Sequence, residues 1–329
     1  MNLHENKRLF RNLAQQMADV LRIPAIYIEK DYWVTYALRA VFSHAIGEDT
    51  VFKGGTALSK CYQMIERFSE DIDLVVMRHE GESDNKLKTK LKTIGKVVSD
   101  LLPEIEVPSI TQKMGMNRKT AHTYDKEFEG GYGQVRDSII IEATWLGYYE
   151  PYTTRTMNSM IGEMLLTNGQ TQLAEQYGLL PFEVRVLEPT RTLCEKIMSL
   201  VRFSYGENPI EDLQQKIRHT YDLHQLLQQA EFSRFFHSPA FDEILLKVAT
   251  DDVKSFRNNN RWLAYHPRES LMFREPDYVW TELSEVYQGE FKNLVYGKLP
   301  AAEAVLNTLK MISERLTTIK WTIEIDFNV

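Results

Sequence analysis

The stretch that decides the fold covers residues 51–76 and reads VFKGGTALSKCYQMIERFSEDIDLVV. The apolar pair Val51-Phe52 predicts a short strand, which runs into two glycines that permit a tight turn. Residues 57–66 predict a helix, and the apolar run Ile72–Val76 predicts a second strand. This order indicates an α/β unit with a tight turn at the end of its first strand.

Two carboxylates, Asp71 and Asp73, open the second strand. Side chains alternate between the faces of a strand, so both acids project on one side while Ile72 and Leu74 enter the core. Two like charges about 4 Å apart repel by ~4 kcal/mol at an effective dielectric of about 20. A divalent cation such as Mg²⁺ would compensate this repulsion and leave room for substrate phosphates. The alternative interpretation is a surface strand with both acids in water.

The residues Gly54-Gly55-Thr56 stand where the first strand meets the helix. Glycine lets the backbone approach a ligand closely, and the free N–H groups of a helix start attract anionic oxygens. Thr56 is expected to cap the helix or to contact a phosphate. The spacing excludes a Walker A loop and a dinucleotide-binding glycine fingerprint. Taken alone, this stretch is also consistent with an ordinary strand-to-helix turn.

Together the two motifs are specific. A Gly-Gly-Thr turn, one helix and then Asp-x-Asp at the start of a strand form the nucleotidyltransferase signature of the DNA polymerase β superfamily. A third carboxylate usually comes from a neighbouring strand, and Glu142 fits because it is the only charge in residues 139–145. The alternative for Glu142 is a strand-end acid that faces water. In such a site a metal bridges acids and phosphates and activates the attacking hydroxyl.

The chain resembles the AbiEii/AbiGii toxin family, which comprises nucleotidyltransferase toxins of type IV toxin–antitoxin and abortive-infection systems. The resemblance covers about residues 25–230. It is carried by five stretches: Ile28–Val34, Lys53–Lys60, Arg67–Leu74, Leu193–Ile197 and Arg218–Leu223. One departure is His219, which stands where many relatives carry an acid.

The motifs and the resemblance together imply roles for single residues. Asp71, Asp73 and Glu142 are expected to hold the metal, and with Lys196 and Asp222 they form the expected catalytic set. The expected nucleotide-binding residues are Gly54, Gly55, Thr56, Lys60, Arg67, Ser69 and Lys196. From the residues alone, Asp222 is also consistent with a helix-surface ion pair, and Lys196 with a lysine that reaches outward to solvent.

The resemblance further implies an α+β fold, in which a polymerase β-like nucleotidyltransferase mixed sheet with flanking helices precedes a helical C-terminal lobe. We expect a nucleotidyltransferase domain with N-terminal helices over residues 1–187 and a helical domain over 188–329. The implied cofactor is Mg²⁺, with Mn²⁺ as an alternative. The implied partners are an NTP, an RNA acceptor such as the tRNA 3′ end, and a cognate antitoxin encoded by an adjacent gene. Such systems act in phage defence.

Composition and charge set further bounds. The 329 residues are 43% hydrophobic and 26% charged, as expected for a globular chain with two lobes. We find no secretory signal or membrane-spanning run, so we expect a cytoplasmic protein in which Cys61 and Cys194 are reduced thiols. A net charge of -7 excludes general attraction to nucleic acid. Basic groups within 86–96 and 113–126 are interpreted as solvated surface or, alternatively, as RNA or nucleotide contacts.

Periodicity predicts the remaining elements. Helices are expected over 5–22, 26–46, 84–101, 190–228 with a turn near Gly206–Pro209, 239–249, 278–295 and 299–317. A β pattern is expected over 104–150 and 184–187, and a loop at Asn258–Asn260.

Three functions remain open from the sequence. The first is Mg²⁺-dependent transfer of a nucleotide from an NTP to an RNA acceptor. The second keeps the fold but uses a protein or small-molecule hydroxyl as acceptor. The third is a non-catalytic module that binds nucleotide or a partner protein.

Overall fold

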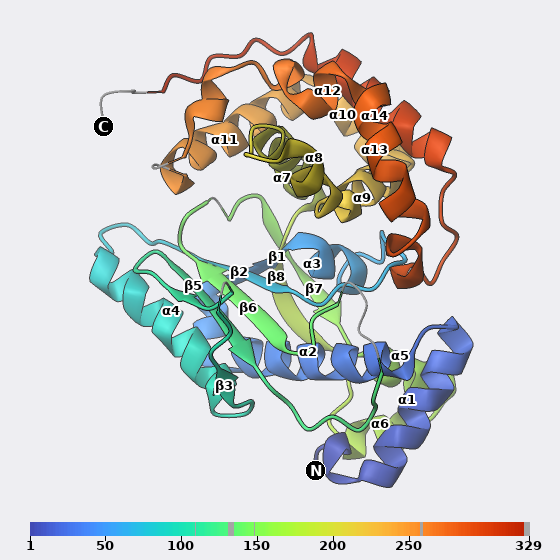
Figure 1. Ribbon diagram of the computed structural model, residues 1–329. Helices are drawn as coiled ribbons and strands as arrows, with labels where there is room; N and C mark the ends of the chain where they lie inside the picture. The colour runs from blue at the N-terminus through green and yellow to red at the C-terminus, as the bar shows by residue number, and fades with distance from the viewer. Residues whose placement is uncertain (109, 131–134, 148, 257–258, 326–329) are drawn as a thin grey trace. The chain divides into compact units, whose positions relative to one another are not determined.

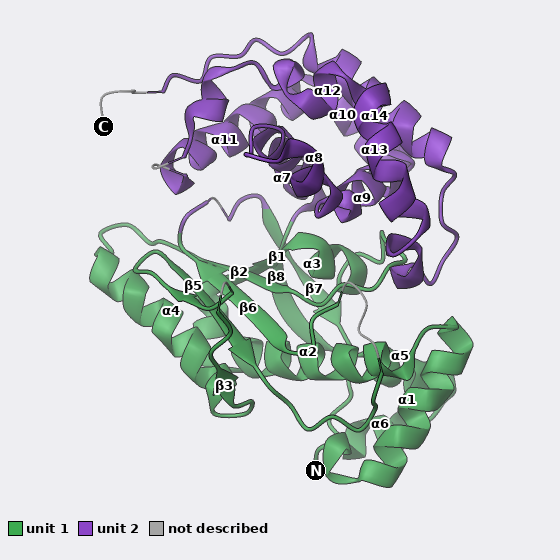
Figure 2. Ribbon diagram, viewed as in Figure 1, with its two compact units in different colours: residues 1–145, 152–187 green, residues 146–151, 188–329 purple. Residues whose placement is uncertain are grey.

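The computed structural model describes residues 1–325 except 109, 131–134, 148 and 257–258 (Figure 1). The chain divides into two compact units, coloured green and purple in Figure 2. Unit 1 contains residues 1–145 and 152–187, and unit 2 contains residues 146–151 and 188–329. The division into a nucleotidyltransferase domain over residues 1–187 and a helical domain over 188–329 stays a prediction.

Unit 1 is built on one mixed sheet with the strand order β3-β5-β6-β2-β1-β8-β7, and β4 pairs with β5. The central strand β2 is antiparallel to β1 and parallel to β6, while β1 is parallel to β8. This arrangement confirms the predicted mixed sheet. The strands are β1 Thr50–Lys53, β2 Ile72–Val76, β3 Glu104–Ile105, β4 Gln112–Lys113, β5 Asn117–His122, β6 Ile139–Thr144, β7 Tyr152–Met157 and β8 Phe182–Leu187.

Helix α2 is the main helix of unit 1. It runs across the sheet in Figure 1 and contacts β6, β8 and the helices α1, α4 and α5. Most of its side chains are buried, so it has no broad polar face. The helices of unit 1 are η1 Leu3–Glu5, α1 Lys7–Leu21, α2 Ala25–Ser43, η2 Ala45–Asp49, α3 Gly54–Lys60, α4 Asp84–Ser99, α5 Met160–Thr167 and α6 Thr171–Gln176.

Unit 2 is helical in its described residues, which confirms the predicted helical C-terminal region. Helix α7 packs against α9 and α11, and α14 packs against α9 and α13. The helices are α7 Pro189–Phe203, α8 Pro209–Gln214, α9 Ile217–Leu227, α10 Ala230–Phe236, α11 Pro239–Ser255, η3 Arg261–Ala264, η4 Pro267–Glu269, α12 Leu271–Arg274, α13 Pro276–Gln288, η5 Phe291–Leu294 and α14 Ala302–Leu316.

The structure corrects several predicted elements. The helix expected over 57–66 instead begins at Gly54 and ends at Lys60. Tertiary contacts hold the residues after it, because the ring of Phe68 stacks on Tyr27 with centroids 4.8 Å apart. The elements β7, α5 and α6 were not predicted. The loop expected at Asn258–Asn260 lies partly outside the described residues.

Two simpler features concern membrane helices and cysteines. Within the described part of the chain, no helix is both long and apolar enough to cross a membrane. Cys61 and Cys194 are free thiols, as predicted. Burial raises the pKa of Cys61 to about 12, so this thiol stays protonated at neutral pH.

The packing of α2 gives a first prediction. Leu38 on α2 is fully buried, and Leu38→Ala is expected to lower the free energy of unfolding by about 2–5 kcal/mol. Val20 on α1 is 69% exposed, and Val20→Ala is expected to change it by less than about 0.5 kcal/mol. Urea denaturation followed by circular dichroism measures both values. Similar losses in the two variants would contradict the central place of α2 in the core.

Candidate functional site

A row of charged residues crosses four neighbouring strands of unit 1. Residues opposite each other in register project on the same face of a sheet, so their side chains are neighbours. The two middle positions of the row are acids, and a lysine stands at each end. The row consists of Lys53 on β1, Asp73 on β2, Glu142 on β6 and Lys119 on β5.

Asp73 is the most perturbed member of this row. Burial raises the pKa of its carboxyl to about 7, and the negative charges of Glu142 and Asp71 add to this effect. The positive charges of Lys53 and Lys119 oppose it. Some of the residue remains accessible to solvent. Asp73 is therefore not an ordinary surface acid, and a cation placed beside it would restore its ionised form.

Asp71 lies one residue before β2 rather than within it, so the expected strand alternation applies only to Asp73. Its Oδ1 accepts a hydrogen bond of 2.9 Å from Arg136 Nη1, and both side chains are about four-tenths exposed. The charge of Asp71 still acts on Asp73. The chain entering β2 therefore carries one acid bound to an arginine and a second acid facing Glu142.

Glu142 is held by two side chains of β5. Lys119 Nζ lies 3.0 Å from one carboxylate oxygen, and Asn117 Nδ2 donates to the other at 3.4 Å. Among the described residues, no three His, Cys, Asp or Glu side chains are arranged as a cation site. The predicted metal-binding acids thus lie on neighbouring segments, but two of them contact basic side chains.

The glycine turn lies against these acids. Gly54 has φ +81°, and a Cβ added there would lie 2.3 Å from Asp73 Oδ2. A Cβ added at Gly55 would lie 2.7 Å from Arg67 Nη2 and 3.1 Å from Ser69 Oγ. Gly54 is favoured by its positive φ and by the approach of Asp73, and at Gly55 a larger residue would displace the end of the Arg67 side chain. The turn is therefore part of the candidate site and not a simple connection.

Thr56 links the turn to the segment before β2. Lys53 takes the N-cap position of α3, so the predicted capping role of Thr56 is wrong. The buried Thr56 hydroxyl instead donates to the main-chain oxygen of Asp71 at 2.7 Å and lies 3.0 Å from Ser69 Oγ. Arg67 is buried as well and donates to the carbonyl of Phe68 at 3.0 Å. These bonds fix the start of α3 to the segment that carries Asp71.

Lys60 stands at the opposite end of α3 from the glycines. Its ammonium group forms a buried ion pair with Asp31 on α2. The second carboxylate oxygen of Asp31 accepts the Met160 N–H at 2.7 Å. Lys60 therefore ties α3 to α2, and its predicted contact with nucleotide stays a prediction.

Lys196 and Asp222 belong to unit 2. Lys196 Nζ on α7 lies 2.7 Å from Asp222 Oδ2 on α9, and the side chains are only 7% and 0% exposed. Asp222 is therefore not part of an ion pair on a helix surface, and Lys196 does not reach outward to solvent. Both alternative interpretations are excluded. Removing one partner of such a pair leaves a buried charge without compensation. The catalytic roles of both residues stay predictions.

Four polar residues of the site were missed in the sequence. They are Lys53, Asn117, Lys119 and Arg136, each of which contacts or influences a predicted acid. Three lysines of the basic group at 113–126 form ion pairs, and Lys113 among them is half exposed, as the solvated-surface interpretation expects. Lys113 lies 2.5 Å from Glu104, Lys119 binds Glu142, and Lys126 lies 3.0 Å from Asp137.

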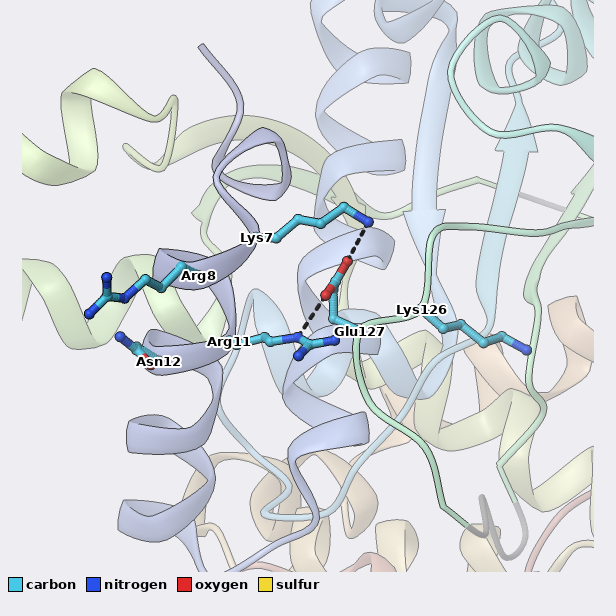
Figure 3. A pocket seen from close by; sticks show the side chains of 6 residues that line it. All are labelled: Lys7, Arg8, Arg11, Asn12, Lys126 and Glu127. Carbon is cyan, nitrogen blue, oxygen red and sulfur yellow. Dashed lines mark hydrogen bonds and ion pairs between the residues drawn. The ribbon is translucent and has the colours of Figure 1, made fainter.

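A cavity of about 490 Å³ lies beside α1 and is distinct from the row of acids (Figure 3). Lys7 and Arg11 both form ion pairs with Glu127, at 2.8 and 2.7 Å. The carboxylate therefore offsets part of the positive charge of the residues that line the cavity. None of the predicted site residues lines it. The lining residues are Lys7, Arg8, Arg11, Asn12, Lys126 and Glu127.

The close approach at Gly54 gives a second prediction. Gly169 also has a positive φ, +71°, but a Cβ there meets nothing within 4 Å. Gly169→Ala is expected to cost about 1–2 kcal/mol from backbone strain alone. Gly54→Ala adds a clash with Asp73 and is expected to cost about 1–3 kcal/mol more. Chemical denaturation measures both, and equal losses would show that Asp73 does not pack against residue 54.

Comparison with known proteins identifies the family. The family model described as "Nucleotidyl transferase AbiEii toxin, Type IV TA system" matches residues 36–308. A solved structure, the nucleotidyltransferase toxin MenT4 from Mycobacterium tuberculosis H37Rv, shares 16% identity with a TM-score of 0.44, covering 93% of this chain and 98% of that chain. No curated protein matches the chain. Because the family match spans most of the sequence, this chain belongs to the AbiEii family of nucleotidyltransferase toxins of type IV toxin–antitoxin systems.

Proposed function

We propose that this nucleotidyltransferase toxin uses Asp71, Asp73 and Glu142 to hold Mg²⁺ and transfers a nucleotide from an NTP to an RNA acceptor. The observation that carries the proposal is the register of Asp73 beside Glu142, with Gly54 packed against Asp73. Carboxylate oxygens are the ligands that Mg²⁺ prefers, and Mn²⁺ accepts the same donors. The RNA acceptor, such as a tRNA 3′ end, is inferred from the family resemblance.

The three acids fit a divalent cation by their charge. The pKa of Asp73 is raised first by burial and then by the negative charges of Glu142 and Asp71, and a cation beside the carboxylate opposes both effects. Binding by all three acids requires Arg136 to leave Asp71 and Lys119 to leave Glu142. The two released cations then lie beside the site and are available to the NTP phosphates. When bound, the cation neutralises charge on the phosphates and lowers the pKa of the attacking hydroxyl.

The residues of the glycine turn would receive the phosphates. Gly54 lies against the Asp73 carboxylate and Gly55 against Arg67 Nη2 and Ser69 Oγ, so phosphates held by a cation at Asp73 would lie beside a guanidinium and a hydroxyl. The Ser69 hydroxyl lies beside Gly55 and would donate to a phosphate placed there. In unit 2, Asp222 would fix the ammonium of Lys196 for contact with nucleotide, and we assign both residues to the transfer reaction.

Membership of the family implies an antitoxin partner and a nucleotide substrate. We extend the proposal to a cognate antitoxin encoded by an adjacent gene, to action in the cytoplasm where NTPs and RNA are present, and to a role in phage defence. A second candidate is transfer to a protein or small-molecule hydroxyl. The net charge of -7 favours it, because an acidic protein does not attract RNA over its whole surface.

The acceptor is tested by incubating the protein with labelled NTPs, Mg²⁺ and total cell extract, then separating RNA from protein. Label is expected in RNA, and Asp73→Asn is expected to lower incorporation by about 100-fold or more, since it removes a metal ligand. Label in protein would establish the second candidate. Nucleotide binding without transfer to any fraction would favour the non-catalytic module.

The raised pKa of Asp73 gives a stability prediction in the absence of metal. Its carboxyl titrates near 3.8 ordinarily and at about 7 in the folded protein, so the folded state favours the protonated form. Asp73 therefore lowers stability progressively as pH rises from about 4 to about 7. Asp73→Asn removes this effect and is expected to be more stable than wild type at pH 8 by about 1–2 kcal/mol.

Asp19, an exposed acid on α1, provides the control. Asp19→Asn is expected to follow the wild-type stability at each pH. Thermal melts between acid and mildly alkaline pH, with EDTA present, measure the three proteins. If the difference in stability between Asp73→Asn and wild type were the same at every pH, the pKa of Asp73 would not be raised in the folded protein, and this account would be contradicted.

A further inference from the structure

Helix α2 carries three consecutive charged residues that are almost entirely buried. Glu29 and Lys30 are 0% exposed, and Asp31 is 3% exposed. Buried charges cost several kcal/mol each unless they are paired and hydrogen-bonded, so each of these residues needs a specific partner. Successive residues of a helix point about 100° apart, and the three side chains therefore reach different segments.

Lys30 reaches the two segments that meet at Asp71. Its ammonium lies 2.5 Å from Glu70 Oε2 and donates to the carbonyl of Ser138 at 2.9 Å and to that of Arg136. The other carboxylate oxygen of Glu70 accepts the Arg136 N–H at 2.9 Å. Lys30 and Glu70 thus hold the main chain of Arg136 by its N–H and by its C=O.

We call Lys30 and Glu70, with their bonds to the main chain of Arg136, the clamp. The clamp adjoins the candidate site at Asp71. Glu70 precedes Asp71 in the chain, and the Arg136 side chain donates to the Asp71 carboxylate at 2.9 Å. The clamp therefore fixes both partners of that contact through their backbones. Glu70 is the chain neighbour of Asp71 and binds the Arg136 N–H, so we infer that the pair influences the row of acids through Asp71 and Arg136.

The neighbours of Lys30 hold two further segments of unit 1. Glu29 accepts the N–H groups of Glu127 and Phe128, at 2.6 and 3.3 Å, on the segment that leads from β5 toward Arg136. Asp31 pairs with Lys60 at the end of α3, the helix that begins with the two glycines. One helix therefore anchors the segment before β2, the segment before β6 and α3.

We propose that Lys30 and Glu70 are positioning residues, which hold the main chains of Asp71 and Arg136 in place, so that the Asp71 carboxylate can bind the cation once the Arg136 side chain has left it. The inference rests on the proposed function, because it assigns a metal to Asp71. A buried ion pair is often no more stabilising than an apolar pair of similar size, so stability alone does not account for it. What the pair supplies is fixed geometry between two segments that are distant in sequence.

The test is the double variant Lys30→Met/Glu70→Gln, which removes both charges and leaves no unpaired charge in the core. It is expected to fold, since both partners are neutralised together. The Mg²⁺ concentration for half-maximal transfer is expected to rise by about tenfold or more, as for loss of groups that orient metal ligands. The rate at saturating Mg²⁺ is expected to change much less, and this split separates positioning from general loss of structure.

A matched control exists in the same unit. Lys90 Nζ on α4 lies 2.8 Å from Glu82 Oε2, the side chains are 8% and 5% exposed, and Lys90 also donates to the carbonyl of Met77. Lys90→Met/Glu82→Gln removes a comparable buried pair, and the described contacts of both residues lie outside the candidate site. It is expected to keep the wild-type Mg²⁺ requirement, and a similar rise in both double variants would overturn the proposal.

A wild-type Mg²⁺ requirement in Lys30→Met/Glu70→Gln would also overturn it. If that variant does not fold, Lys30→Gln/Glu70→Gln decides, because it leaves no unpaired charge and glutamine keeps an oxygen for the Arg136 N–H and an N–H donor at residue 30. It is expected to show a smaller rise, and an unchanged requirement or loss of folding would refute positioning. The Mg²⁺-dependent increase in melting temperature provides a readout that needs no acceptor. If the proposed function itself is wrong, the wild-type protein will show neither stabilisation by Mg²⁺ nor nucleotide transfer.

Discussion

The carboxylate of Asp73 fills the space that a side chain at residue 54 would occupy, and the candidate site depends on this contact. The antiparallel pairing of β1 with β2 brings the glycine turn to Asp73, and the parallel pairing of β2 with β6 adds Glu142. Burial and the neighbouring acids then raise the pKa of Asp73 to about 7. The sheet thus concentrates negative charge beside backbone that a ligand can approach closely, which is the arrangement that our proposed metal and NTP require.

Local chemistry explains which parts of the site could be predicted from the sequence. The strand at Ile72–Val76 depends mainly on nearby residues and was predicted with the correct position. The two glycines were predicted to allow a tight turn, and Gly54 has a positive φ in the structure. The helix expected over 57–66 was wrong because residues beyond Lys60 are held by tertiary contacts, such as the stacking of Phe68 on Tyr27. Propensity is a weak guide where such contacts compete with it.

Pairings between distant segments could not be predicted in the same way. The register that sets Asp73 beside Glu142 joins strands about seventy residues apart, and Lys119 enters the site only through it. The buried charges of α2 were also not foreseen, since a charged residue in a helix usually predicts a solvent-exposed face. For Lys196 and Asp222 the resemblance supplied roles, while the ion pair between α7 and α9 required the structure.

The central claim is that the acids of unit 1 bind a divalent cation together with nucleotide, and equilibrium binding of Mn²⁺ followed by electron paramagnetic resonance tests it most directly. The wild-type protein is expected to bind Mn²⁺, with higher affinity when a non-hydrolysable NTP analogue is present, because phosphates and carboxylates share the cation. Asp73→Asn is expected to lose this site while remaining folded. Mn²⁺ binding of the same affinity in both proteins would contradict the account.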